Sequence, residues 1–123
     1  HAMKSIDQGY LGFGEAYFSK ADSKAIKGWK LHKKMTLNLV VPVGSVRFIL
    51  YDNRSERNNT SQFQEVILDE KRNYSRLTIP PMIWVGFQGI SQTTSLVLNL
   101  ANIEHSKEEI KRKELEDIKF NWS

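Results

Sequence analysis

The 123-residue chain contains no cysteine, which excludes disulfide bonds and thiolate metal sites. It has no apolar run near the ~20 residues that a membrane-spanning helix needs, so we expect no membrane partner. It shows no internal repeat and no low-complexity tract. No signal peptide is visible, and the cytoplasm is therefore the expected location. The opening residues 1–3, HAM, look like a tag remnant, so His1 is left out of functional reasoning.

The chain also has little excess charge of either sign. The 18 Lys and Arg residues exceed the 14 Asp and Glu residues by a net charge of +4, which mildly favours an anionic partner. The positive charges are scattered among carboxylates, unlike the basic stripe that binds nucleic acid, so we expect no nucleic-acid partner. A phosphorylated small molecule needs only a few well-placed cations.

The apolar residues predict a small all-β domain. A hydrophobic content of 40% is enough for one core, and we expect a single domain over residues 4–123. Short apolar segments separated by turn residues are typical of a sandwich or barrel rather than a parallel α/β sheet. We expect Pro42 to end its strand or to form a bulge. The expected strands are residues 15–19, 36–43, 46–54, 63–68, 75–81, 84–89 and 95–102.

One segment has the pattern of a helix. Residues 106–118, SKEEIKRKELEDI, contain the i, i+4 charge pairs Glu108–Arg112 and Glu109–Lys113. Its apolar residues are sparse, so we expect a short helix on the surface near the C-terminus.

Several blocks of the sequence resemble a known family. They are AIKGWKLHKKMTLNLVVPVGSVRFILYDNR, FQEVIL, YSRLTIPPMIWVGFQG and LNLANIEH, in that order, within residues 15–122. Together they resemble the cupin family of dTDP-4-dehydrorhamnose 3,5-epimerases. Residues 27–34 are also similar to the RGxHxHKK-type strand of dTDP-sugar 3,4-ketoisomerases. The resemblance implies a cupin-like jelly-roll barrel, a homodimer, and a site for a nucleoside-diphosphate sugar in the barrel mouth.

The chain departs from the family pattern at two histidine positions. Lys30 stands where the epimerases carry their catalytic histidine, and His32 keeps the second histidine of the ketoisomerase motif. In the later block IPPMIWVGF, Val85 replaces another family histidine. Residues i and i+2 of a strand face the same side, so Lys30 and His32 would both point into the barrel.

The resemblance implies proton transfer next to a keto group. We expect His32 as the base, Lys30 as enolate stabiliser or as base, and His105, near the place of the family's acid tyrosine, as the opposite acid. A lysine acts as a base only when burial or like charge lowers its pKa toward ~7–8. It stays open that both histidines are structural polar residues.

A carboxylate would orient His32 if the epimerase pattern holds. The candidates are Glu114, Asp117 and Glu15. No metal and no cofactor is expected, because metal cupins use two or three histidines, and Lys30 and Val85 occupy such positions here.

Further residues are candidates for substrate binding. Among the cations Lys27, Lys33, Arg47, Arg54 and Arg76, we expect Lys27 and Arg76 to contact a diphosphate. Trp29 and Trp84 could stack on the base or line the sugar pocket. Asn38 lies among apolar residues and either links strands or faces the substrate.

Three functions remain open at this point. The favoured one is a nucleotide-sugar epimerase that acts on a dTDP-4-keto-6-deoxyhexose in cell-surface polysaccharide biosynthesis. The alternatives are a 3,4-ketoisomerase of the same substrate class and a cupin that binds the sugar nucleotide without turnover.

Overall fold

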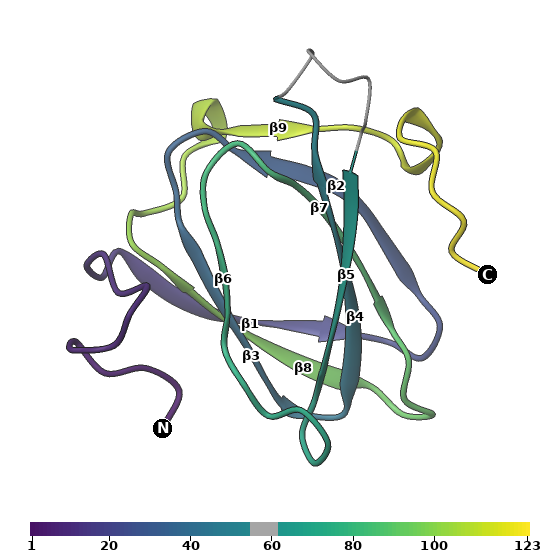
Figure 1. Cartoon of the computed structure of the whole chain (residues 1–123), viewed down its shortest axis with the longest axis horizontal. Coiled ribbons are helices and arrows are strands. Elements are labelled where there is room, and N and C mark those ends of the chain that lie inside the picture. Colours follow the sequence, from purple (N-terminus) through teal and green to yellow (C-terminus); the bar gives the residue numbers. More distant parts are fainter. Residues whose placement is uncertain (55–61) are drawn as a thin grey trace.

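A computed structural model describes residues 1–54 and 62–123. Two antiparallel sheets face each other and form the expected cupin-like jelly roll (Figure 1). The four-stranded sheet has the order β1-β8-β3-β6, and the five-stranded sheet has the order β5-β4-β7-β2-β9. The strands are β1 (Glu15–Ala21), β2 (Ile26–His32), β3 (Leu37–Val43), β4 (Ser45–Asp52), β5 (Gln62–Asp69), β6 (Leu77–Ile79), β7 (Trp84–Gly89), β8 (Ser95–Ala101) and β9 (Ile110–Arg112).

Alternating side chains divide the hydrophobic residues between two clusters. In β4, Phe48 packs between the sheets with residues such as Leu39 and Val97, whereas its neighbour Ile49 belongs to a second cluster. That second cluster packs on the other face of the five-stranded sheet. Fully burying one such side chain contributes about 1.5–3 kcal/mol. The buried members of the second cluster are Trp29, Leu31, Ile49, Trp84 and Ile118.

The C-terminal segment forms a strand where the sequence predicted a helix. The prediction for residues 106–118 was wrong: β9 lies there between two short 3-10 turns, η2 (Lys107–Glu109) and η3 (Leu115–Asp117). β9 pairs with the edge of β2, which places Arg112 opposite Lys30. An i, i+4 charge pair contributes only about 0.2–0.5 kcal/mol, whereas the open edge of β2 offers backbone groups that must be paired or covered.

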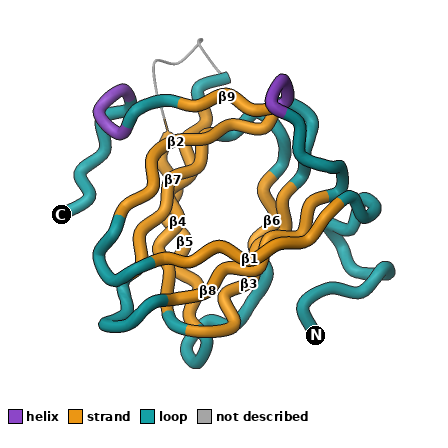
Figure 2. The backbone as a smooth tube through the Cα atoms, turned by 180° about the vertical axis from the view of Figure 1, so that it is seen from behind, coloured by secondary structure: helices purple, strands orange, loops and turns teal. Residues whose placement is uncertain are grey.

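After β9 the chain packs against the outside of the barrel (Figure 2). Arg47 lies over the rings of Phe120 and Trp122, at 5.4 and 5.5 Å from their centroids. Its guanidinium also donates to the carbonyl oxygen of Trp122 at 3.2 Å. The terminal aromatics therefore cover the second cluster and hold the segment that carries β9.

Two strands contain bulges. The pairing of β3 with β8 shifts register between Val40 and Val43, as predicted from Pro42. The pairing of β2 with β7 shifts between Lys27 and Lys30. A bulge inserts one extra residue into a strand and re-aims the side chains beyond it, so the second shift changes which residues of β2 face the interior.

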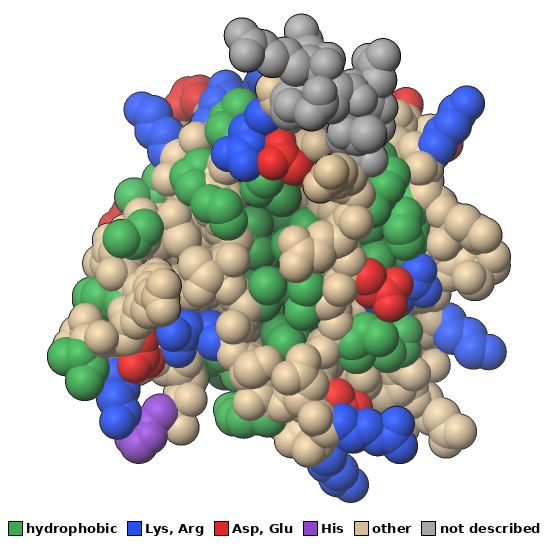
Figure 3. All heavy atoms as spheres, in the orientation of Figure 1, with side chains coloured by type: hydrophobic (Ala, Val, Ile, Leu, Met, Phe, Trp, Pro, Cys, Tyr) green, Lys and Arg blue, Asp and Glu red, His purple; other side chains and the backbone are tan. Residues whose placement is uncertain are grey.

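The charged surface is mixed. On the face in Figure 3, Lys and Arg side chains are scattered around the rim, with acidic side chains among them. No helix in the described parts of the chain is both long and apolar enough to cross a membrane.

Candidate active site

A cavity of about 400 Å³ lies between the two sheets. Strands of both sheets contribute to its wall. At its mouth, the lining residues Lys27 and Arg112 are exposed and Tyr17 is 37% exposed, whereas His32 is buried. The lining residues are Tyr17, Ser19, Lys27, Gly28, Lys30, His32, Leu37, Leu39, Phe48, Val85, Phe87, Val97, Asn99 and Arg112.

Three polar side chains of β2 face this cavity. Lys30 and His32 are two positions apart and share a face, as predicted. Lys27 would face the other side of a regular strand, because it is three positions from Lys30. The bulge between these two lysines restores the inward direction, and Lys27 lies over the Phe87 ring at 5.6 Å.

His32 forms a buried pair with Glu109. The Nδ1 atom of His32 lies 2.9 Å from Oε2 of Glu109. The other carboxylate oxygen accepts hydrogen bonds from the backbone N–H groups of Lys34, at 2.6 Å, and Met35, at 2.8 Å. Because an ionised carboxylate only accepts, Nδ1 carries the proton and Nε2 has a lone pair. Nε2 is buried and has no hydrogen-bond partner among the described residues.

The pKa values of His32 and Glu109 are both lowered, which favours a neutral imidazole beside an ionised carboxylate. Burial lowers the pKa of His32 below its ordinary value, and the hydrogen bond to Glu109 offsets only part of that effect. Burial alone would raise the pKa of Glu109, but hydrogen bonds from the Lys34 backbone, His32 and Met35 hold it below its ordinary value. The imidazole is therefore neutral and the carboxylate ionised at neutral pH.

Cations gather on the same wall. Arg112 of β9 stands directly opposite Lys30, and both line the cavity together with Lys27. Burial lowers the pKa of Lys30, and the charges of Arg112 and Lys27 lower it further. The cavity wall thus presents a positive field to an anionic ligand.

A tyrosine lies on the other wall. Tyr17 belongs to β1 of the four-stranded sheet, whereas His32 belongs to the five-stranded sheet. Burial raises the pKa of Tyr17, Glu15 raises it further, and Arg112 opposes them. Its hydroxyl is therefore protonated at neutral pH. Asn99 also lines this wall and donates to the backbone oxygen of Tyr17 at 3.3 Å.

Two predicted binding residues lie away from the cavity, which corrects the expected sugar-pocket placement. Trp29 is only 1% exposed and packs in the second cluster, where its indole N–H donates to the carbonyl oxygen of Leu115 at 3.2 Å. Trp84 belongs to the same cluster. Alternation explains the placement of Trp29, since it neighbours the inward-facing Lys30 and therefore points outward.

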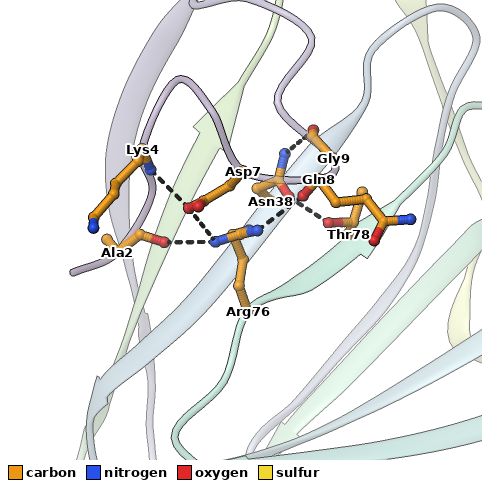
Figure 4. Close-up of polar contacts among 8 residues, drawn as sticks. All are labelled: Ala2, Lys4, Asp7, Gln8, Gly9, Asn38, Arg76 and Thr78. Atoms are coloured by element: carbon orange, nitrogen blue, oxygen red, sulfur yellow. Dashed lines mark hydrogen bonds and ion pairs between the residues drawn. The ribbon is translucent and has the colours of Figure 1, made fainter.

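Arg76 is likewise held elsewhere (Figure 4). Its guanidinium pairs with Asp7 at 3.1 Å and donates to the carbonyl oxygens of Gln8, at 2.9 Å, and Ala2, at 3.2 Å. It fixes the N-terminal segment and does not line the cavity, so the expected diphosphate contact does not fit its position.

Asn38 forms a structural link in the same region (Figure 4). Its amide donates to the carbonyl oxygen of Gly9 at 3.1 Å, and its oxygen accepts from the Thr78 hydroxyl. Of the two readings that the sequence left open, the strand link fits these contacts.

The predicted acid and the predicted orienting carboxylates are not in the cavity wall. His105 is exposed on the segment between β8 and η2. Glu114 and Asp117 cap η3, where the Glu114 N–H donates to the Asp117 carboxylate at 3.0 Å. Glu15 lies on β1, and its Oε1 has no hydrogen-bond partner among the described residues.

Sequence reasoning missed Glu109, Arg112 and Tyr17 as site residues. The helical interpretation of residues 106–118 hid the first two, because only the pairing of β9 with β2 brings them to His32 and Lys30. An available signal for Tyr17 was the alternation of the strand predicted over residues 15–19, which puts Tyr17 and Ser19 on one face.

Comparisons with known proteins point to one family. Residues 15–119 match the family described as FdtA: WxcM-like, C-terminal. The chain is 24% identical over 115 residues to the spore coat polysaccharide biosynthesis protein SpsL of Bacillus subtilis (strain 168), covering 90% of this chain and 76% of SpsL.

Solved structures share the fold. A dTDP sugar isomerase from Desulfovibrio desulfuricans G20 has a TM-score of 0.92 and 35% identity, covering 99% of this chain and 79% of that one. The sugar 3,4-ketoisomerase QdtA from Thermoanaerobacterium thermosaccharolyticum, in complex with TDP, has a TM-score of 0.72 and 20% identity. The match covers 89% of this chain and 72% of QdtA. A dTDP-4-dehydrorhamnose 3,5-epimerase from Bacillus anthracis str. Ames has a TM-score of 0.71 and 19% identity, covering 82% of this chain and 59% of that one. The last two likenesses concern the fold alone.

Proposed function

Because the chain belongs to the WxcM-like, C-terminal family (FdtA), we propose that it is an isomerase that epimerises a nucleotide-linked 4-keto-6-deoxyhexose. The observation that carries the proposal is the neutral His32 held by Glu109 in a cavity whose opposite wall presents Tyr17. The 35% identity to a dTDP sugar isomerase supports the reaction class and the dTDP-sugar substrate.

His32 is the proposed base. Its Nε2 removes the proton from a carbon next to the keto group, and the Glu109 carboxylate stabilises the imidazolium that forms. General base catalysis of this kind typically raises the reaction rate of an enzyme by about 10²–10⁴-fold.

The cations stabilise negative charge. Loss of the proton converts the keto oxygen into an enolate, and Lys30 beside His32 supplies positive charge in a partly buried site. Lys27 and Arg112 lie at the exposed mouth, which suits contact with the diphosphate of the substrate.

Tyr17 is the proposed acid. Epimerisation requires that a proton return on the face opposite the base. Tyr17 stands on the opposite sheet and carries a proton at neutral pH, as its raised pKa indicates. We therefore transfer to Tyr17 the role that the sequence suggested for His105.

A 3,4-ketoisomerase is the second candidate. Moving the keto group needs removal of a proton from one carbon and its return to the neighbouring carbon, and a single imidazole can carry out both steps when they take place on one face. Among the described residues that line the cavity, His32 is the one histidine, and this observation favours the alternative. A binding protein without turnover is the third candidate, since Lys30 and Val85 stand at two family histidine positions.

One experiment separates these functions. The purified protein is incubated with dTDP-4-keto-6-deoxyglucose in D₂O, and the C3 and C5 protons are followed by NMR. Deuterium at C3 and C5 indicates epimerisation, and movement of the keto group to C3 indicates ketoisomerisation. Binding without exchange would refute an isomerase activity on this substrate.

We further propose that the protein is a homodimer. β1 is the outer strand of its sheet, and its Phe18 side chain is 65% exposed. Phe13, just before β1, is 68% exposed. A second copy would cover this edge and its apolar side chains. Light scattering tests the stoichiometry, and Phe18→Asp should give monomers; a monomeric parent protein would refute the proposal.

The biological setting rests on the relatives. SpsL is named as a protein of spore coat polysaccharide biosynthesis, which supports a role in making cell-surface polysaccharide. The cytoplasmic location stays a prediction.

A further inference from the structure

Asn99 is a polar residue on the apolar inner face of β8. Buried and half-buried side chains alternate along this strand, and Asn99 has the buried direction. Its inward neighbours Val97 and Ala101 belong to the hydrophobic core between the sheets. Asn99 itself is 7% exposed and lines the cavity. An amide among apolar side chains costs free energy unless its polar atoms find partners, so the partners of each atom indicate what this residue does.

The amide nitrogen of Asn99 is fully engaged within the four-stranded sheet. This nitrogen lies 3.3 Å from the carbonyl oxygen of Tyr17, 3.1 Å from the hydroxyl oxygen of Ser19 and 3.2 Å from the carbonyl oxygen of Val97. Carbonyl oxygens only accept hydrogen bonds, so they fix which end of the amide is the nitrogen. Two N–H protons have three acceptors within reach, and the amide is held in one orientation.

The amide oxygen of Asn99 has no such partner. Within residues 1–54 and 62–123, Oδ1 accepts no hydrogen bond, and it is not among the unpaired side-chain atoms of these residues that are sealed from solvent. Strands β1 and β3 flank β8 on both sides, so the small exposed part of this buried residue faces the cavity that it lines. The cavity wall therefore presents a fixed acceptor whose donor comes from within the cavity.

Asn99 lies beside the proposed acid and on the sheet opposite the proposed base. Its register partner on β1 is Tyr17, and its partner on β3 is Leu39. Both partners line the cavity, and His32 lines it from the other sheet. A sugar ring between the sheets therefore has Tyr17 and Asn99 on the same side. A 4-keto-6-deoxyhexose joined to a diphosphate through C1 has free hydroxyl groups at C2 and C3, and each can donate a hydrogen bond.

We propose that Oδ1 of Asn99 accepts a hydrogen bond from one of these ring hydroxyl groups and selects sugars that carry it; the inference rests on the nucleotide-sugar substrate proposed above. A buried group that binds a substrate hydroxyl rejects the analogue without it, because the protein atom is then left unpaired. Leu39 and Val97 beside Asn99 are apolar, so the amide also fixes the orientation of the ring. Asn99 is thus a specificity-determining residue next to Tyr17.

Calorimetry with three sugar nucleotides tests the inference. They are dTDP-6-deoxyglucose and its 2-deoxy and 3-deoxy counterparts, which have no keto group and therefore bind without turnover. The hydroxyl at C4 is common to all three and cancels in the comparison. The full chain should bind dTDP-6-deoxyglucose roughly 5- to 150-fold more tightly than the counterpart that lacks the hydroxyl bound by Asn99. The weakened counterpart identifies C2 or C3, and equal affinities for all three sugars overturn the inference.

Asn99→Ala removes Oδ1 and should remove this preference. Its affinity for dTDP-6-deoxyglucose should fall to that for the weakened counterpart, whose own affinity should stay unchanged. Asn38→Ala is the matched control, because Asn38 is a buried amide of the same sheet that contacts Gly9 and Thr78 and lies outside the cavity wall. This control should keep the full preference. A preference retained by Asn99→Ala overturns the inference, and if that variant does not fold, the comparison within the parent protein decides.

The hydroxyl preference and the D₂O result are read separately. A preference that depends on Asn99 supports the inference even when the protein exchanges no proton, and in that case the proposed turnover fails while the hydroxyl contact stands. Proton exchange by the parent protein without a hydroxyl preference overturns the contact and leaves the isomerase function intact. Failure to bind TDP and all three sugars overturns both proposals.

Discussion

Nδ1 of His32 lies 2.9 Å from Oε2 of Glu109, although the two residues are 77 positions apart in the chain. The β9–β2 pairing brings them together, and two backbone N–H groups fix the carboxylate. Glu109 is therefore a positioning residue: it sets which ring nitrogen of His32 carries the proton.

Glu109→Gln tests this role. The glutamine oxygen can still accept from the Lys34 and Met35 backbones, but its amide N–H then faces Nδ1 of His32. The ring proton moves to Nε2, and the base is lost. We expect a folded protein whose turnover falls by up to roughly 10⁴-fold, as a wrong tautomer causes in other enzymes.

The proton position in this variant can be measured directly by ¹⁵N NMR of the His32 ring. The exposed neighbour Glu108 supplies the matched control, and Glu108→Gln should behave like the parent protein. Full activity of Glu109→Gln with an unchanged tautomer would show that the carboxylate does not position the base.

The pH dependence follows from the lowered pKa of His32. Burial is the main cause, and the ordinary value is 6.5. The unfolded chain therefore binds a proton at pH values where folded His32 resists it, so the free energy of unfolding decreases as pH falls below about 6.5. The rise of kcat/KM with pH should likewise have its midpoint below 6.5.

Denaturant titrations from pH 7.5 to 5 measure this effect, with His32→Asn as comparison. The parent protein should lose more stability over that range than the variant does. Equal losses in both proteins would show that His32 does not resist protonation in the folded state. The lowered pKa of Glu109 affects the free energy of unfolding at lower pH. Its stabilising contribution is fully present above about pH 4.5 and is lost as the pH falls through the folded pKa of Glu109.

Arg112→Gln tests the cationic mouth of the cavity. Loss of one charged hydrogen bond to a phosphate should weaken binding by about 1.5–3 kcal/mol, or roughly 10- to 150-fold in Kd. Calorimetry with TDP measures the change. Lys111→Gln, at an exposed neighbouring position that does not line the cavity, is the control and should bind like the parent. Equal affinity of the Arg112 and Lys111 variants would remove Arg112 from the binding site.

Trp29→Phe tests the assignment of Trp29 to the second cluster. The change removes the hydrogen bond to Leu115 and part of the buried ring, so stability should fall by about 1–3 kcal/mol. Affinity for TDP should stay unchanged, because the side chain lies outside the cavity wall. Unchanged stability together with weaker TDP binding would instead place Trp29 at the ligand.

The strands were predictable because their patterns are local. β8 alternates between buried and half-buried side chains along its length, and β3 carries the long apolar run that ends at Pro42. The inward direction of Lys30 and His32 also followed from alternation. The same alternation argues against a pocket role for Trp29, which was suggested by its residue type.

The rest of the site depends on distant contacts. β9 has only three residues, two of them charged, and it exists because the edge of β2 offers it partners. Glu109 and Arg112 could therefore not be placed from their own segment. The bulge that turns Lys27 inward is likewise set by the pairing of β2 with β7.

The rate of deuterium incorporation into dTDP-4-keto-6-deoxyglucose by His32→Asn, compared with His105→Asn, tests the central claim most directly. The claim is that His32, and not the exposed His105, is the base in the cavity. We predict that His32→Asn abolishes incorporation next to the keto group and that His105→Asn retains the parent rate. Incorporation at the parent rate by His32→Asn would contradict the claim.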